Sequence, residues 1–212
     1  MLGTGSVGAT LAGKLVALGH AVRMGAREHG NEKARAWADS AGENASSGAF
    51  ADAARFGDVV FNATAGAGSV EAVRAAGKEN LKGKVVIDVS NPLDFTQGMP
   101  PRLFTAAAGD SLAERIQAEL PESRIVKTLN TINASVMVDP SRVGAESDIF
   151  LCGNDPAAKE EVASLLKEFG WESVVDLGPL TAARGMEAYV LFWLQLWGAL
   201  KTPDFNIRIA RK

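Results

Sequence analysis

The chain of 212 residues carries 22 Lys and Arg against 25 Asp and Glu, and 47% of its residues are hydrophobic. This composition supports a folded core and excludes a long multidomain array, and a net charge of −3 argues against a nucleic-acid partner. The single cysteine, Cys152, excludes an intrachain disulfide and a thiolate zinc site and favours the cytoplasm. The most apolar stretch, 186–200, is shorter than the roughly 20 residues that a membrane span needs, so we expect no membrane association.

Short apolar runs alternate with amphipathic runs along the chain. A helix is predicted over 6–18, because its apolar residues form one stripe and Gly19 follows where helices often end. Asn31 is placed to cap a second helix, which ends before a turn-rich segment at 42–48. Further helices are predicted at 111–120, 156–169 and, with Thr181 as cap, up to residue 200. Strands are predicted at 21–24, 59–63, 85–89, 125–129, 149–152, 174–177 and 205–209.

This alternation predicts an α/β fold, a doubly wound parallel sheet with helices on both faces. We place a soft boundary near Gly178, which separates a main domain, 1–178, from a small and mostly helical C-terminal portion, 179–212. The last helix is apolar nearly all round, and such a surface usually packs against a second subunit. We therefore expect a homodimer.

A glycine-rich motif opens the first predicted helix. Gly3, Gly5 and Gly8 match G-x-G-x-x-G, with Thr4, Ser6 and Val7 between them. The first glycine permits a tight turn, the second lets the backbone approach a pyrophosphate, and the third lets the helix pack closely on its strand. The motif predicts a dinucleotide site, and a purely structural glycine turn is the alternative.

The strand that should precede this motif is nearly absent, since only Met1 and Leu2 come before Gly3. Two interpretations follow. Either the first strand is truncated and the true start lies upstream, or the sheet tolerates a gap. We favour the first, because a gap would leave backbone donors and acceptors unpaired in the core.

The residues after the second strand bear on the choice of nicotinamide cofactor. A site for NAD would place an acid there to bind the ribose 2′-hydroxyl, whereas this chain has Arg27. A guanidinium suits a 2′-phosphate, and Lys33 is a candidate second cation. The sequence therefore favours NADP, with Glu28 as the feature that leaves NAD open, and two solvated surface charges as the alternative.

Three further loops at predicted strand ends are polar but mostly uncharged. They contain Ala63 and Thr64, then Asn91, then Ala134. Small residues with amides and hydroxyls can close on a ribose and a flat ring, although Asn and Thr are also common turn formers. No acid–base pair is evident in these loops, which suits direct hydride transfer between two rings.

The sequence resembles the coenzyme F420-dependent NADP oxidoreductase family. The resemblance rests on the segments LGTGSVG (2–8), GAR (25–27), KTLNTINA (127–134), CGND (152–155) and DLGPL (176–180). It implies a Rossmann domain, dimerisation, and hydride exchange between NADPH and a deazaflavin (F420) or flavin ring. The last two segments are also similar to the cytosolic domains of six-transmembrane metalloreductases.

The resemblance also implies residue roles. Residues 4–7 would hold the pyrophosphate and Arg27 the 2′-phosphate, with Lys33 as a less secure match; Ala63, Thr64, Asn91 and Ala134 would lie along the ribose and nicotinamide. Ala26 stands where relatives often carry a hydroxyl, and Asn130 and Asn133 replace the His and Pro of the archaeal deazaflavin enzymes.

The sequence thus favours an NADPH-dependent oxidoreductase that passes hydride to F420, a flavin or another planar carrier. Two alternatives stay open: reduction of a small imine or carbonyl compound, and a sensor that binds NADP without turnover. No catalytic side chain and no metal ligand is assigned.

Overall fold

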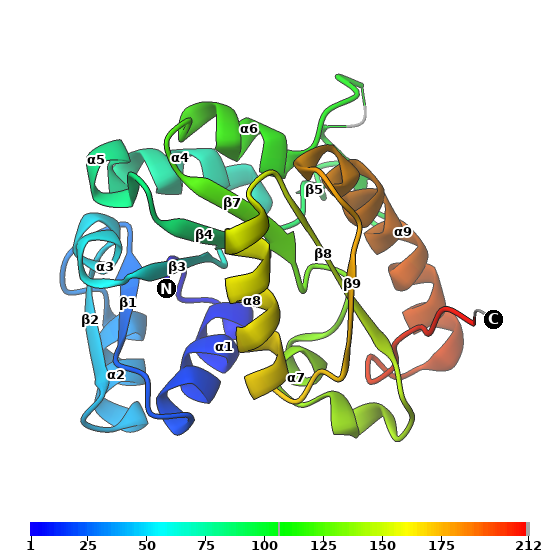
Figure 1. Ribbon diagram of the computed structural model, residues 1–212, viewed down its shortest axis with the longest axis horizontal. Coiled ribbons are helices and arrows are strands. Elements are labelled where there is room, and N and C mark those ends of the chain that lie inside the picture. The colour runs from blue at the N-terminus through cyan, green and yellow to red at the C-terminus, as the bar shows by residue number, and fades with distance from the viewer. Residues whose placement is uncertain (106, 211–212) are drawn as a thin grey trace.

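The computed structural model describes residues 1–105 and 107–210, and its strands form a sheet covered by helices (Figure 1). The strands are β1 (Val22–Ala26), β2 (Ala45–Ala49), β3 (Val59–Asn62), β4 (Val85–Asp88), β5 (Leu93–Asp94), β6 (Arg102–Leu103), β7 (Arg124–Thr128), β8 (Asp148–Gly153) and β9 (Ser173–Asp176). The helices are α1 (Ser6–Ala17), α2 (Glu32–Ala41), α3 (Phe50–Phe56), α4 (Gly66–Ala76), α5 (Lys78–Leu81), α6 (Leu112–Glu119), α7 (Ala134–Val138), α8 (Pro156–Glu168) and α9 (Ala183–Leu200), with 3-10 turns η1 (Pro140–Val143) and η2 (Leu180–Ala182).

The main sheet has the strand order β3-β4-β7-β8-β9, and β1 and β2 pair with each other beside it. The pairings are parallel except that β8 runs antiparallel to β7. This corrects the expectation of a uniformly parallel sheet. The connection from β7 to β8 contains only the five-residue α7 and a 3-10 turn, whereas a parallel return usually uses a helix long enough to run back along the sheet.

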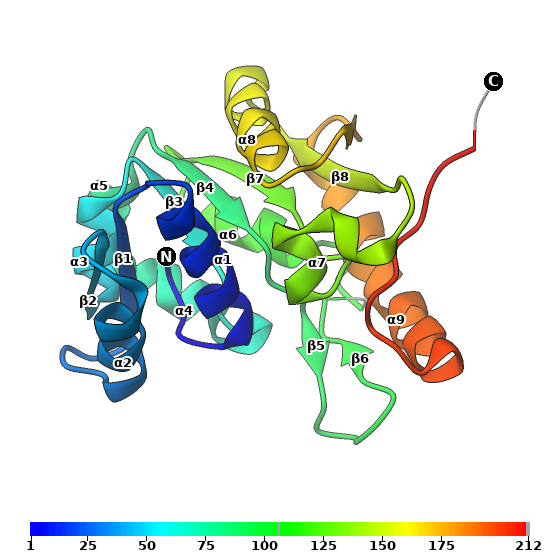
Figure 2. The same cartoon turned by 90° about the horizontal axis from the view of Figure 1, so that it is seen from below.

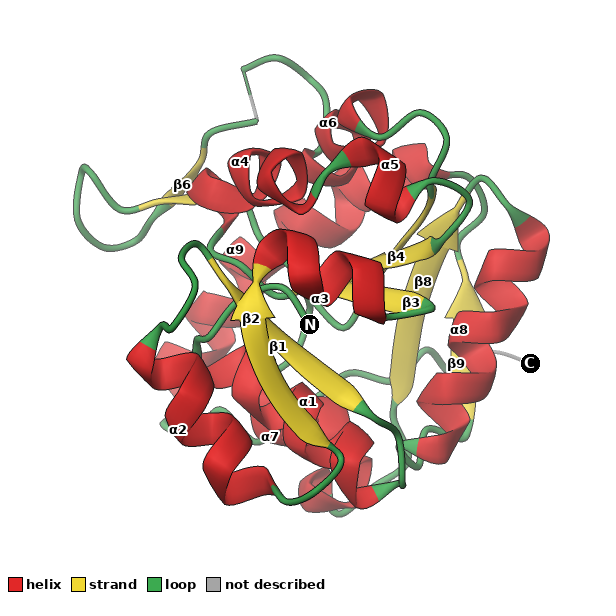
Figure 3. Ribbon diagram, turned by 90° about the vertical axis from the view of Figure 1, so that its left-hand side faces the viewer, coloured by secondary structure: helices red, strands yellow, loops and turns green. Residues whose placement is uncertain are grey.

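Residues 1–3 lie between β1 and β3 and join the two parts of the sheet (Figure 3). Leu2 forms parallel bridges to both Gly25 and Asn62, and its N–H donates to the carbonyl of Phe61 at 2.7 Å. Met1 contributes to the core on one face of the sheet and Leu2 to the core on the other. Backbone pairing at this end of the sheet is therefore continuous from β1 to β3.

Each face of the sheet has its own apolar core. Helices α1, α2, α7 and α8 contribute buried residues to one cluster, and α3 to α6 with α9 contribute to the other. Neighbouring residues within a strand alternate between the clusters, as Val85 and Val86 do in β4. The predicted doubly wound α/β architecture is confirmed.

Local capping explains why several helices begin where the sequence predicts. The side chains of Asn31, Ser111 and Asp155 accept hydrogen bonds from the third residue of α2, α6 and α8, respectively. The predicted cap at Thr181 is wrong, because this residue lies inside η2 and α9 follows directly without a side-chain cap.

Two strand predictions are wrong. The segment 42–48, expected to be turns, contains most of β2, whose residues pair in register with β1. The expected strand at 205–209 is instead an irregular tail without strand assignment, held by a hydrogen bond from the N–H of Asp148 to the carbonyl of Ile207. Figure 2 shows this tail beside α9 and the β5–β6 hairpin projecting from the body. Among the described residues, no helix has both the length and the apolarity that crossing a bilayer requires.

Candidate functional site

The glycine-rich motif forms a tight turn between residue 2 and α1. Gly3 has φ +112°, and a Cβ on it would lie 2.6 Å from the carbonyl oxygen of Ala63. A Cβ on Gly8 would lie 2.4 Å from the carbonyl oxygen of Gly3. The first and third glycines are therefore required by close backbone packing.

The second glycine has a different environment. Gly5 is exposed, and a Cβ built on it would meet nothing within 4 Å. Gly5 is also the N-cap of α1, where no side chain accepts a hydrogen bond from the first turn. An open surface at the N-terminus of a twelve-residue helix, with its backbone N–H groups uncapped, fits an anionic pyrophosphate.

Arg27 and Lys33 lie near the edge of the sheet at which the glycine turn is found. Arg27 directly follows β1, and the N–H of Gly3 donates to the carbonyl of Gly25 in that strand at 3.1 Å. Both cations are exposed, and neither takes part in an ion pair within the described part of the chain. The nearby His29 instead pairs with Asp52 at 2.8 Å.

The loop after β3 packs directly against the glycine turn. The N–H of Ala63 donates to the carbonyl of Leu2 at 2.9 Å, and the Thr64 hydroxyl donates to Oδ1 of Asn62 at 2.6 Å. Ala63 and Thr64 are both partly exposed. The structure thus brings this loop and residues 3–8 together.

Asn91 lies in the loop after β4 and is bound to the loop after β7. Its Nδ2 donates to the carbonyl oxygen of Asn130 at 2.8 Å, and Nδ2 of Asn130 donates back to Oδ1 of Asn91 at 2.9 Å. Asn130 also donates to the carbonyl oxygen of Met186 in α9 at 3.0 Å. Its own Oδ1 is buried without a hydrogen-bond partner in the described structure.

A cavity of about 820 Å³ opens between these loops and the β5–β6 hairpin. Its walls are mainly apolar. It is lined by Val7, by residues 63–67 after β3, by residues 89–91 after β4, and by Leu93, Asp94, Phe95, Thr96 and Phe104 of the hairpin region. Asp94 is the one titratable side chain in this lining, and the N–H of Thr96 that donates to it lowers its pKa.

Ala134, the remaining predicted site residue, does not line this cavity. It is the first residue of α7, and its N–H donates to Oδ1 of Asn133 at 2.9 Å. Asn133 and Ser135 in turn donate to Asp204 in the C-terminal tail. The amide of Ala134 is thus already engaged in this structure.

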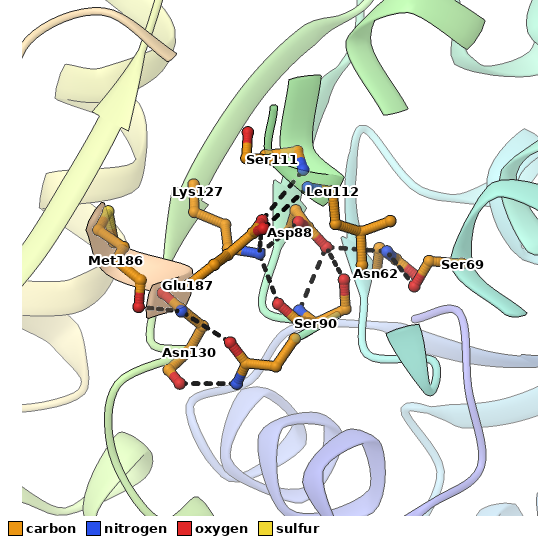
Figure 4. Close-up of polar contacts among 12 residues, drawn as sticks. Asn62, Ser69, Asp88, Ser90, Ser111, Leu112, Lys127, Asn130, Met186 and Glu187 are labelled. Carbon is orange, nitrogen blue, oxygen red and sulfur yellow. Dashed lines mark hydrogen bonds and ion pairs between the residues drawn. The ribbon is translucent and has the colours of Figure 1, made fainter. Parts of the chain in front are cut away.

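Three buried charged residues lie behind the loops, and sequence reasoning assigned no function to any of them (Figure 4). Lys127 and Asp88 are 0% exposed and Glu187 is 1% exposed. Nζ of Lys127 lies 2.8 Å from Oδ2 of Asp88 and 3.0 Å from Oε1 of Glu187. A signal was present in the sequence, because Asp88 and Glu187 each interrupt an otherwise apolar run.

The three charges influence one another. Burial by itself would lower the pKa of Lys127, but the carboxylates, Asp88 foremost, raise it above its ordinary value. Burial raises the pKa of Glu187, while Lys127 and the N–H of Leu112 oppose that rise. Among the described residues, no group of three or more His, Cys, Asp and Glu could hold a metal ion.

Comparisons with known proteins point to one family. Residues 1–92 match the family model described as NADP oxidoreductase coenzyme F420-dependent. The chain is 31% identical over 158 residues to the F420-dependent NADP reductase of Methanocaldococcus jannaschii. The match covers 74% of this chain and 70% of that protein. It is 30% identical over 119 residues to the metalloreductase STEAP3 of Rattus norvegicus, covering 56% of this chain and 22% of that one.

A solved structure is similar along almost the whole chain. It is that of a protein from Arthrobacter sp. FB24 assigned as an F420-dependent NADP reductase, with a TM-score of 0.93 and 50% sequence identity. The match covers 99% of this chain and 97% of the other.

Proposed function

Because this chain belongs to the family of F420-dependent NADP oxidoreductases, we propose that it transfers hydride between NADP(H) and coenzyme F420. The residues of the candidate site fit such a pair of ligands. The glycine turn offers an anion site, and the cavity beside it offers mainly apolar walls for flat rings.

The single observation that carries this proposal is that the glycine turn and the cavity are continuous with each other. Val7 belongs to the glycine-rich motif and also lines the cavity. Ala63 and Thr64, from the loop that packs on Gly3, line the same cavity. A dinucleotide whose pyrophosphate lies at the start of α1 can therefore extend its nicotinamide toward the cavity. We propose Thr4, Gly5, Ser6 and Val7 as the pyrophosphate-binding residues.

Arg27 and Lys33 would give the preference for NADP over NAD. Both are exposed cations without an ion-pair partner in the described chain, so both are available to a 2′-phosphate. A guanidinium can bind a phosphate through two parallel hydrogen bonds, which an exposed Lys cannot match.

The chain's contribution to the reaction would be to position the two ring systems and to exclude water from them. When bound, NADPH supplies the hydride, and one proton from solvent balances the reduction of the deazaflavin. Thr64, Ser90 and Asn91 can orient ring amides and hydroxyls, while Phe95 and Phe104 cover apolar ring surface. The engaged carboxylate of Asp94 is not required as an acid.

We further propose that residues 179–212 form a dimerisation and acceptor-side element, with the chain acting as a homodimer in the cytoplasm. Three large apolar side chains of α9, Phe192, Trp197 and Leu200, are 43–56% exposed. Such a surface on one helix supports contact with a second copy. The single cysteine agrees with a reducing compartment.

The test is a panel of acceptors with the purified protein. NADPH is supplied with F420, with free flavins, and with a cyclic imine acid, and its oxidation is followed. The proposal expects turnover with F420 that exceeds turnover with the imine, and a much lower rate when NADH replaces NADPH. Turnover with the imine alone would identify a small-molecule reductase, and tight NADPH binding without any turnover would identify a binding protein.

A further inference from the structure

The ammonium of Lys127 has all three of its N–H donors used. It donates to Oδ2 of Asp88, contacts Oε1 of Glu187, and donates to the backbone carbonyl of Ser90. The last contact is to a residue that lines the cavity. One buried cation on β7 therefore holds the loop after β4.

Asp88 also binds the loop after β4, through Oδ1, the carboxylate oxygen that does not contact Lys127. Oδ1 accepts from the backbone N–H of Ser90 at 3.2 Å, from its hydroxyl at 2.6 Å, and from Nδ2 of Asn62 at 2.9 Å. Asn62 in turn accepts from the hydroxyl of Thr64. The contacts of Asp88 thus reach the cavity lining through both Ser90 and Thr64.

Glu187 connects these contacts to the C-terminal helix. Its carboxylate accepts from the N–H groups of Leu112 and Ala113 at 2.8 and 3.1 Å, at the start of α6. The preceding residue, Met186, accepts from Asn130, whose amide pairs with Asn91. Two consecutive residues of α9 therefore contact the loop after β7 and Lys127, and Lys127 in turn contacts the loop after β4 (Figure 4).

A role in stability alone explains this arrangement poorly. Buried ion pairs are often no more stabilising than apolar residues of the same volume, because desolvation offsets the attraction. Here one ammonium faces two carboxylates, and the two N–H groups of α6 supply the remaining positive potential to Glu187. Lys127 and Asp88 both contact Ser90, which lines the cavity, and the neighbouring Asn91 is held by Asn130.

We propose that Asp88, Lys127 and Glu187 form a positioning network that holds Ser90 and Asn91 in place for hydride transfer, and that Glu187 makes this positioning depend on α9. The part that concerns hydride transfer rests on the function proposed above. None of the three residues lines the cavity, so they are positioning residues and not catalytic ones.

The test compares Glu187→Gln with Ser123→Ala. Ser123 is a matched control, because it is buried just before β7 and its hydroxyl donates to the carbonyl of Leu81 at 2.9 Å, at the opposite end of the sheet. For each variant, kcat, the KM for each substrate, the Kd for NADPH and the melting temperature are measured below the unfolding transition. Misplaced reacting groups lower the rate of a hydride transfer much more than they lower cofactor affinity.

We expect Glu187→Gln to lower kcat by about tenfold or more while the Kd for NADPH changes by less than about threefold, since misplacement by about 1 Å can cost about a hundredfold in rate. Ser123→Ala should keep kcat within about twofold of the wild type, even if its melting temperature falls by as much as that of Glu187→Gln. A kcat for folded Glu187→Gln equal to that of Ser123→Ala would overturn the proposal. If Glu187→Gln does not fold, Glu187→Asp, which keeps the buried negative charge and shortens the side chain that reaches Lys127 and α6, takes its place with the same criterion.

Amide hydrogen exchange without any ligand separates this inference from the proposed function. Glu187→Gln should accelerate exchange in segments 89–93 and 130–134, and Ser123→Ala should not. Faster exchange in a protein that fails to reduce F420 would support the network and reject the proposed acceptor. Unchanged exchange in both segments would reject the network whatever the acceptor.

Discussion

Asn91 and Asn130 form a reciprocal pair across the ends of β4 and β7: Nδ2 of Asn91 donates to the carbonyl of Asn130 at 2.8 Å, and Nδ2 of Asn130 donates to Oδ1 of Asn91 at 2.9 Å. The pair fixes the spacing of two loops that follow adjacent parallel strands. One of these loops lines the cavity and the other contacts α9.

Replacing Asn91 with Ala should therefore destabilise the protein. The change removes both hydrogen bonds and leaves the carbonyl of the buried Asn130 without this donor, so the free energy of unfolding should fall by about 1–3 kcal/mol. Urea denaturation measures the change. Asn80→Ala, which removes one hydrogen bond from an amide in α5 to the carbonyl of Ala76 at the end of α4, is the control, and an equal loss in both variants would show that the pair has no special role.

Gly5→Ala should separate binding from folding. A Cβ at Gly5 meets nothing within 4 Å and the backbone φ is −75°, so the melting temperature should stay close to that of the wild type. The added methyl group would occupy the surface that a pyrophosphate approaches, and the Kd for NADPH should rise at least about tenfold, or about 1.4 kcal/mol.

Gly13→Ala is the matched control for that variant. It also adds a methyl group to α1 where nothing lies within 4 Å, but in the helix interior. It should raise stability by about 0.4–1 kcal/mol and leave NADPH binding unchanged. If Gly5→Ala bound NADPH as well as Gly13→Ala does, the glycine turn would not be the pyrophosphate site.

Arg27→Gln should weaken NADPH binding and leave NADH binding nearly unchanged. A hydrogen bond to a charged group contributes about 1.5–3 kcal/mol, which corresponds to roughly 10–100-fold in Kd. Fluorescence titration with both cofactors measures the two constants. Arg35→Gln is the control, because Arg35 is exposed on α2 about 200° around the helix from Lys33. Equal losses of affinity for NADPH and NADH would rule out a role of Arg27 in recognising the 2′-phosphate.

Cys152 should be inert in the folded protein. It is 0% exposed, and burial raises its pKa to about 12, so that about one thiol in ten thousand is ionised at pH 8. Below that pKa, the thiolate fraction rises about tenfold for each unit by which the pH is increased. Iodoacetamide followed by mass spectrometry should therefore label the unfolded chain at pH 8 and leave the native chain unlabelled. Similar labelling rates in the two states would show that the thiol is accessible.

Local signals explain what could be predicted from the sequence. The glycine turn and the caps at Asn31 and Asp155 depend on residues within a few positions of one another, and the sequence predicted each of them, whereas the cap at Ser111 was not predicted. The apolar runs of β3, β4 and β7 were likewise sufficient to predict buried parallel strands.

Tertiary contacts explain what the sequence did not reveal. Strand β2 has small polar residues and no apolar alternation, and its conformation follows from pairing with β1. The tail at 205–209 alternates as a strand would, but it is assigned no strand pairing. Lys127 and Glu187 are 60 positions apart in the sequence, and only the packing of α9 on the sheet brings them within 3.0 Å.

The central claim, direct hydride transfer from NADPH to F420, is tested most directly with NADPH that carries deuterium at the transferred position of the nicotinamide. The account predicts that the reduced F420 gains one deuterium by mass spectrometry and that this label does not exchange with solvent during turnover. Reduced F420 without deuterium, or NADPH oxidation without any reduction of F420, would contradict it.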